Sequence, residues 1–100
     1  MAVEVTAKPP RSAGAPTAVS VGVASTVVVE RNAARRGLVL VNTSAARISL
    51  AFGGTAVLDS GITLYPNGGT FMMNEWSFSA VAVNAIASAP ASNLAIEEFS

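Results

Sequence analysis

The sequence predicts an all-β protein, a small antiparallel β-sandwich or β-barrel of jelly-roll type with an extended N-terminal arm. Three observations lead to this prediction. Apolar residues alternate with polar residues at a period of two, turns rich in glycine, proline or asparagine separate the alternating segments, and no segment keeps the period of a helix. About seven short strands joined by turns are typical of a sandwich or a barrel.

The N-terminal residues predict the arm. Residues 1–17 contain the sequence Lys-Pro-Pro-Arg and a further proline, Pro16, and this proline spacing excludes a helix. Such a segment is either a frayed terminus or an arm that binds a neighbouring subunit, in which case the prolines reduce the entropy lost on docking. We therefore divide the chain into an extended arm at 1–17 and a sandwich or barrel domain at 18–100.

The strands follow from the alternating pattern. Valine occupies every second position from Val19 to Val23, and a β-branched run follows after a bend. The segment from Gly37 to Val41 is continuously apolar, as expected of a central strand that is covered on both faces. The predicted strands are Ala18–Ala24, Thr26–Glu30, Gly37–Val41, Ile48–Phe52, Ile62–Leu64, Phe71–Phe78, Ala80–Ile86 and Leu94–Phe99.

The connections are predicted from turn residues. Arg31–Arg36 is expected to be a loop or a single helical turn, and Asn42–Ala45 a tight turn that joins the flanking strands into a hairpin. The two Gly-Gly-Thr sequences, at Gly53–Thr55 and Gly68–Thr70, differ in their flanking residues and are interpreted as independent turns. Neither is a phosphate-binding loop, because no lysine follows.

Composition favours a protein that neighbours cover. One hundred residues form one domain, and the hydrophobic fraction of 51% includes 19 alanines and 13 valines, so the core is modest. Only 12% of the residues are charged, fewer than a freely diffusing monomer usually carries. The net charge of zero argues against general nucleic-acid binding, which needs a positive surface.

The charges are unevenly distributed. Up to position 47, six basic and two acidic residues give +4, and the four acidic residues after it give −4. One interpretation is that strands from the two halves lie side by side and pair these charges within the domain. The other is that the oppositely charged faces bind another copy of the chain or a partner. Two uncharged segments, Ser12–Val29 and Trp76–Ile96, contain too many polar groups or prolines to predict a membrane span.

Catalysis is not expected. The chain has no histidine and no cysteine, which removes the usual general base and the strongest nucleophile, and the adjacent Glu97 and Glu98 would point to opposite faces of a strand. The carboxylates are too scattered to predict a metal site. We therefore expect no catalytic residue, no cofactor and no metal.

Some residues are candidates for a partner interface, although each also has a structural interpretation. The arginines before Gly37 are either a solvated loop or a docking site, and Tyr65 either closes the end of the barrel or anchors an interface. Trp76 and Phe78 either fill the core or form a platform for a sugar. The candidate interface residues are Lys8, Pro9, Pro10, Arg11, Arg31, Arg35, Arg36 and Tyr65.

Three motifs resemble those of small all-β virion proteins of tailed bacteriophages. They are N-x-x-R-R-G-L-V-L-V-N at Asn32–Asn42, I-S-L-A-F-G-G at Ile48–Gly54, and G-I-T-L-x-P-x-G-G at Gly61–Gly69. The resemblance extends over residues 18–100 and includes the closing acidic strand Leu94–Glu98. It departs at Asn67, which separates the proline from the glycine pair, and in the methionine-rich strand that follows.

The resemblance implies a structural role without catalysis. The expectation that it supports is a capsid decoration, or cement, protein that binds the major capsid protein on the capsid exterior as a homo-oligomer, with a trimer favoured, after synthesis in the host cytoplasm. Neck, tail and fibre components share the pattern and are the alternative within the virion. A carbohydrate-binding module that uses Trp76 and Tyr65 is the alternative outside it.

Overall fold

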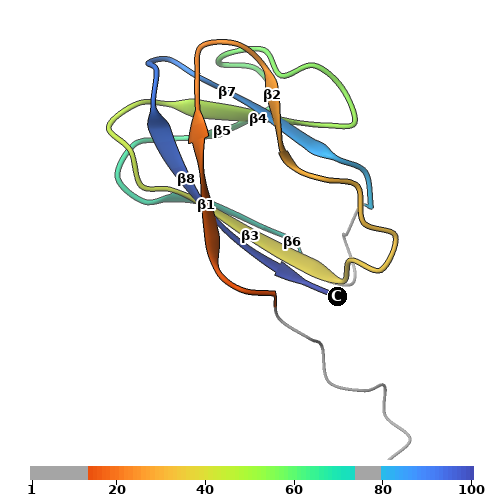
Figure 1. Cartoon of the computed structure of the whole chain (residues 1–100). Coiled ribbons are helices and arrows are strands. Elements are labelled where there is room, and N and C mark those ends of the chain that lie inside the picture. The colour runs from red at the N-terminus through yellow and green to blue at the C-terminus, as the bar shows by residue number, and fades with distance from the viewer. Residues whose placement is uncertain (1–13, 74–79) are drawn as a thin grey trace, which may run out of the picture.

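The computed structural model describes residues 14–73 and 80–100, which form two four-stranded antiparallel sheets packed as a sandwich (Figure 1). Sheet A contains β1 (Thr17–Val21), β3 (Gly37–Asn42), β6 (Gly69–Met73) and β8 (Ser92–Phe99). Sheet B contains β2 (Thr26–Val29), β4 (Ile48–Phe52), β5 (Ile62–Leu64) and β7 (Val83–Ala87). No helix capable of crossing a membrane occurs in this part of the chain.

The strand order is that of a jelly roll. The order is β1-β8-β3-β6 in sheet A and β2-β7-β4-β5 in sheet B, and all pairs are antiparallel. Apart from β4 and β5, successive strands lie in opposite sheets, so the chain crosses between the layers at almost every connection. Eight strands in this arrangement form a double-sheet jelly roll, and the predicted fold class is confirmed.

The core between the sheets consists mainly of leucine, isoleucine and valine side chains. Leu38, Leu40 and Leu94 of sheet A and Ile48 and Val83 of sheet B are completely buried. They alternate along their strands with residues that point outward, as the period of two predicts. A tilted ring pair between Phe52 of β4 and Phe71 of β6, with centroids 5.5 Å apart, links the two sheets.

The predicted strands are confirmed, with differences at their ends. β1 stops at Val21 and β7 starts at Val83, so both are shorter than expected, whereas β8 starts earlier, at Ser92. The predicted loop 31–36 contains one turn, which is closed by a 3.1 Å hydrogen bond from the Arg35 amide to the Asn32 carbonyl. Part of the predicted strand Phe71–Phe78 lies outside the described residues, together with Trp76.

The last residues of the predicted arm are attached to sheet A. The amide of Gly14 donates a 2.9 Å hydrogen bond to the Glu98 carbonyl, and Thr17 begins β1 opposite Ile96. Gly14 therefore lies beside the C-terminal end of β8 and extends the ladder between β1 and β8. The remainder of the arm, residues 1–13, lies outside the described residues.

The predicted hairpin between β3 and β4 is wrong. β3 pairs with β6 and β8, whereas β4 pairs with β5 and β7, so the two strands lie in different sheets. The completely buried Asn42 stands at this crossing: its Nδ2 donates to the carbonyls of Ala46 (2.7 Å) and Leu64 (2.9 Å), and its Oδ1 accepts the amide of Ser44 (2.9 Å). The side chain thereby satisfies backbone groups that a hairpin ladder would otherwise pair.

The turn between β5 and β6 needs both of its glycines. Gly68 has a φ of 121°, which side chains rarely allow, and its amide donates to the carbonyl of Asn42 at 2.7 Å. A Cβ at Gly69 would lie 2.5 Å from the backbone nitrogen and oxygen of Tyr65, so no side chain fits there. This turn therefore brings Tyr65 against the corner at Asn42.

Replacing Asn42 by alanine is expected to lower the free energy of unfolding by about 3 kcal/mol, because the buried carbonyls of Ala46 and Leu64 would lose their donor. Urea denaturation measures the loss. Asn93→Ala is the matched control, because Asn93 is exposed and its side-chain amide donates to the Thr43 hydroxyl at the surface. We expect this substitution to change the free energy of unfolding by less than about 0.5 kcal/mol. Equal losses in the two variants would contradict the role of Asn42.

Candidate interaction surface

Part of the outer face of sheet B is covered by the chain itself. The loop at 53–61 leaves β4, and its Gly53 amide donates to the Ala82 carbonyl at 2.8 Å. Farther along, the Ala56 amide donates to the Ser25 hydroxyl at 2.9 Å, and the Asp59 amide donates to Ser49 Oγ at 2.8 Å. Ser49 points outward from β4 yet is completely buried, so the loop lies over this part of the sheet.

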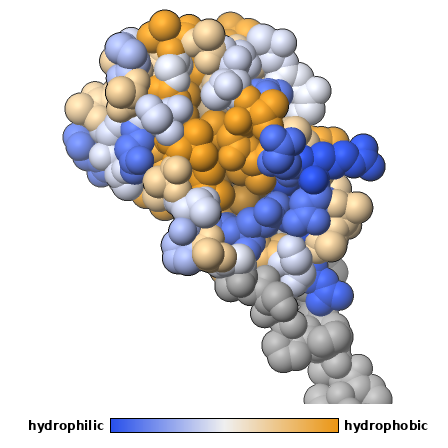
Figure 2. All heavy atoms as spheres, in the orientation of Figure 1, coloured by the Kyte–Doolittle hydropathy of each residue, from blue (hydrophilic) through white to orange (hydrophobic). Residues whose placement is uncertain are grey.

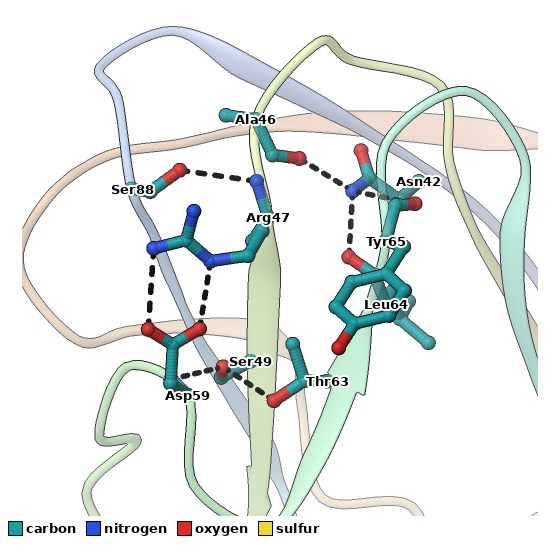
Figure 3. Close-up of polar contacts among 9 residues, drawn as sticks. All are labelled: Asn42, Ala46, Arg47, Ser49, Asp59, Thr63, Leu64, Tyr65 and Ser88. Atoms are coloured by element: carbon teal, nitrogen blue, oxygen red, sulfur yellow. Dashed lines mark hydrogen bonds and ion pairs between the residues drawn. The ribbon is translucent and has the colours of Figure 1, made fainter.

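Polar contacts hold this loop in place (Figure 3). Arg47 forms a bidentate ion pair with Asp59, with Nε–Oδ1 at 2.7 Å and Nη2–Oδ2 at 3.1 Å. Ser49 Oγ lies 2.9 Å from Thr63 Oγ1. The hydrogen bonds to Asp59, and then its charge, raise the pKa of Arg47. The pair is exposed and contributes little by itself, whereas the buried Ser49 ties the loop to the sheet.

The outer face of sheet A is apolar and more open. Val39 and Val41 of β3 and Ala95 of β8 point outward and are only partly buried, and Met72 of β6 is 66% exposed. The register places these residues side by side, with Val39 between Glu97 and Met72 and Val41 opposite Ala95. The apolar run of β3 is thus central in its sheet, as predicted, but its outer side is incompletely covered.

A groove runs across this face between β1, β8 and β3. Its volume is about 160 Å³, and it is lined by Pro16, Thr17, Val39, Val41, Ala95, Ile96 and Glu97. Its walls are apolar except at Thr17 and Glu97. Glu97 Oε2 is buried and has no hydrogen-bond partner among the residues that the structure describes. The groove therefore combines an apolar wall with Glu97, one carboxylate oxygen of which is buried without a partner among the described residues.

Hydrophobic groups are also visible on the face of the molecule that Figure 2 shows. In Figure 2 they gather in the middle of the face toward the viewer, and strongly hydrophilic residues lie to either side. The large hydrophobic residues that are exposed in the described part of the chain are Val23, Val27, Val57, Tyr65 and Met72. These five residues lie on different elements, and Met72 of β6 is the one among them on the outer face of sheet A.

Arg35 does not belong to the predicted interface, because its side chain is inside the protein. Only 1% of Arg35 is exposed. Its Nε contacts Glu98 Oε2 at 2.6 Å, and its two terminal nitrogens donate to the carbonyls of Val81 (2.8 Å) and Glu30 (2.7 Å). The guanidinium thereby joins three separate segments, which is a structural role, and the sequence could not distinguish Arg35 from its neighbour Arg36.

The other predicted interface residues are not brought together. Arg31 is exposed and Arg36 partly buried, both just before β3, whereas Tyr65 is 68% exposed and lies beside Asn42, at the opposite end of β3. Lys8, Pro9, Pro10 and Arg11 lie outside the described residues. These residues therefore do not form one continuous site in the described part of the chain.

Glu97 is the residue whose importance the sequence did not reveal. The prediction that Glu97 and Glu98 point to opposite faces agrees with the structure, since Glu98 pairs with the buried Arg35 and Glu97 lines the outer groove. The only signal in the sequence was a carboxylate two residues from Ala95 on one face of the predicted strand. Among residues 14–73 and 80–100, no cluster of three or more acidic, histidine or cysteine side chains could hold a metal ion.

Comparison with models of known protein families finds no match, and comparison with curated proteins finds none either.

Replacing Arg35 by methionine is expected to destabilise the protein by about 3 kcal/mol, because Glu98 would lose its buried partner and two carbonyls would lose their donors. Arg31→Met, at an exposed position, is the matched control and should change stability by less than about 0.5 kcal/mol. Thermal and urea denaturation test both variants. An Arg35→Met protein of normal stability would contradict the structural role.

Replacing Ser49 by alanine is expected to increase hydrogen exchange of the Asp59 amide about tenfold, because that amide would lose its acceptor. Exchange measured by NMR tests this expectation. Thr63→Val is the control, since it removes the other hydroxyl of the pair but leaves Ser49 Oγ in place. Equal acceleration in both variants would show that Ser49 does not hold the loop.

Proposed function

We propose that this protein is a non-enzymatic structural protein of a bacteriophage virion, and that it decorates and stabilises the capsid by binding the major capsid protein lattice from outside. The observation that carries the proposal is the unequal covering of the two sheets. The loop at 53–61 lies over sheet B, whereas sheet A presents an apolar outer face beside the last residues of the arm, where the arm joins the domain. A face of this kind suits a subunit that neighbours cover in an assembly.

Two further features support this proposal. The motifs at Asn32–Asn42, Ile48–Gly54 and Gly61–Gly69 resemble those of small virion proteins of tailed bacteriophages. The jelly roll is a fold found in viral capsid proteins, although it also occurs in lectins, so that the fold by itself is an analogy. The low charge of the chain, 12% of residues, agrees with a surface buried between subunits.

The mechanism is binding alone. Apolar area on the outer face of sheet A is removed from water against neighbouring subunits, and this contributes roughly 25 cal/mol per Å² before the entropy of association is subtracted. Repetition of weak contacts over the lattice raises the overall binding affinity, because each attached subunit holds the next at a high effective concentration. The capsid is thereby stabilised against internal pressure.

Added to capsids that lack it, the purified protein is expected to co-sediment with them and to raise their melting temperature. Met72→Asp, on the open face of sheet A, should weaken binding at least about tenfold, because a charge would replace a buried contact. Val57→Asp is the matched control: Val57 is also exposed, at 58%, but lies on the loop over sheet B.

Several outcomes would contradict the proposal. Absence of binding to capsids, or binding without stabilisation, would exclude a decoration role. About a dozen copies per particle, counted in a cryo-EM map, would indicate a neck or tail subunit instead. Binding to glycans that Tyr65→Ala abolishes, without binding to capsids, would favour a carbohydrate-binding module.

A further inference from the structure

The carboxylate of Glu97 lies in apolar surroundings on the outer face of sheet A. Its neighbour across the ladder is Val39, and it lines the groove together with Pro16 and Val41. Oε2 is buried without a hydrogen-bond partner among the described residues. Such an oxygen destabilises the protein unless a donor or a cation reaches it. The groove is therefore suited to a ligand that carries a positive charge between apolar groups.

The chain itself contains a segment of this chemistry. Residues 1–13 include Lys8 and Arg11 on either side of two prolines, and Val3 and Val5 precede them. The buried Arg35 already pairs with Glu98, and Arg47 pairs with Asp59 on the other sheet. The remaining described arginines, at 31 and 36, belong to the loop before β3 rather than to the lining of the groove.

We propose that the groove binds residues 1–13 of a second copy of this chain. Lys8 or Arg11 of that copy pairs with Glu97, and the valines and prolines around them cover Val39, Val41 and Ala95. The charges are complementary, and a desolvated pair of this kind fixes the register of the bound segment. Fully extended, thirteen residues span roughly 45 Å, enough to cross from one domain of this size to another.

Geometry favours a second copy over the arm of the same chain. Gly14 lies beside the C-terminal end of β8, outside the lining of the groove, to which Pro16 and Thr17 belong. In an extended chain, Arg11 and Lys8 would lie roughly 16 Å and 26 Å from Pro16. Pro9 and Pro10 favour extended backbone and oppose the reversal that would return either basic group to its own Glu97.

A face-to-face dimer is the other way in which two copies could cover this surface. Such a two-fold contact would place the same residues against each other. The outward residues of β1, β8, β3 and β6 in this face include no lysine or arginine, so both Glu97 side chains would remain without a cation. The carboxylate therefore favours the arm over the face as the occupant.

The inference concerns contacts between copies, so it is tested without capsids and independently of the proposed function. Analytical ultracentrifugation of the full chain should show an assembly heavier than the 10.1 kDa monomer, and deletion of residues 2–13 should yield the monomer. Glu97→Lys, and separately Lys8→Glu with Arg11→Glu, should each weaken association at least about tenfold, and the three changes together should restore it. Glu30→Lys, an exposed charge reversal outside the groove, is the control and should not change association.

Cross-linking distinguishes the copies. The chain has no cysteine, so single cysteines can be introduced. A Lys8→Cys protein or an Arg11→Cys protein, mixed with a Glu97→Cys protein, should form a disulfide-linked heterodimer under mild oxidation. Asn93→Cys, at the polar end of the same face, should not replace Glu97→Cys. Circular dichroism verifies that each variant is folded. Three results would each overturn the proposal. The full chain could stay monomeric at its highest soluble concentration, or the assembly could survive deletion of residues 2–13. The triple charge change could also fail to restore association.

Discussion

The fold depends on the way in which the ends of β3 are fixed. At its C-terminal end, the buried amide of Asn42 bonds the backbone at Ser44, Ala46 and Leu64 and directs the chain from sheet A into sheet B. Just before its N-terminal end, Arg35 joins Glu98 to the carbonyls of Val81 and Glu30. Between these two points, Leu38 and Leu40 are completely buried in the core. A small aliphatic core needs such polar anchors, because apolar burial alone specifies the crossings weakly.

These anchors also explain why the two outer faces differ. Once β4 is directed into sheet B, the loop at 53–61 returns over its outer face and is held there by Ser49. Sheet A receives no comparable cover from the described residues, and its groove is lined in part by Glu97, whose Oε2 is buried. The adjacent glutamates thus have different roles: Glu98 stabilises the interior, and Glu97 gives the open face its charge. This asymmetry gives the molecule one face suited to neighbours.

The contrast between Arg35 and Arg36 shows where sequence reasoning fails. Both precede an apolar strand, and both are candidates for either a solvated loop or a partner interface from the sequence alone. A guanidinium can pair in the interior or in solvent, and the choice depends on whether a carboxylate and free carbonyls lie within reach. Glu98 is 63 residues away in the sequence, so only the folded chain brings them together. The wrong hairpin has the same origin, since the partner carbonyl of Leu64 lies 22 residues from Asn42.

The sequence by itself determined the all-β class, the strands and the glycine turns, because alternation and turn residues act locally along the chain. Its composition alone shows that the chain has no histidine and no cysteine side chain. Only the tertiary structure decided which strands pair, which arginine is buried, which sheet is covered and which of two adjacent glutamates faces the groove. Those choices depend on groups far apart in the sequence, whose energies arise only when the two sheets close on each other.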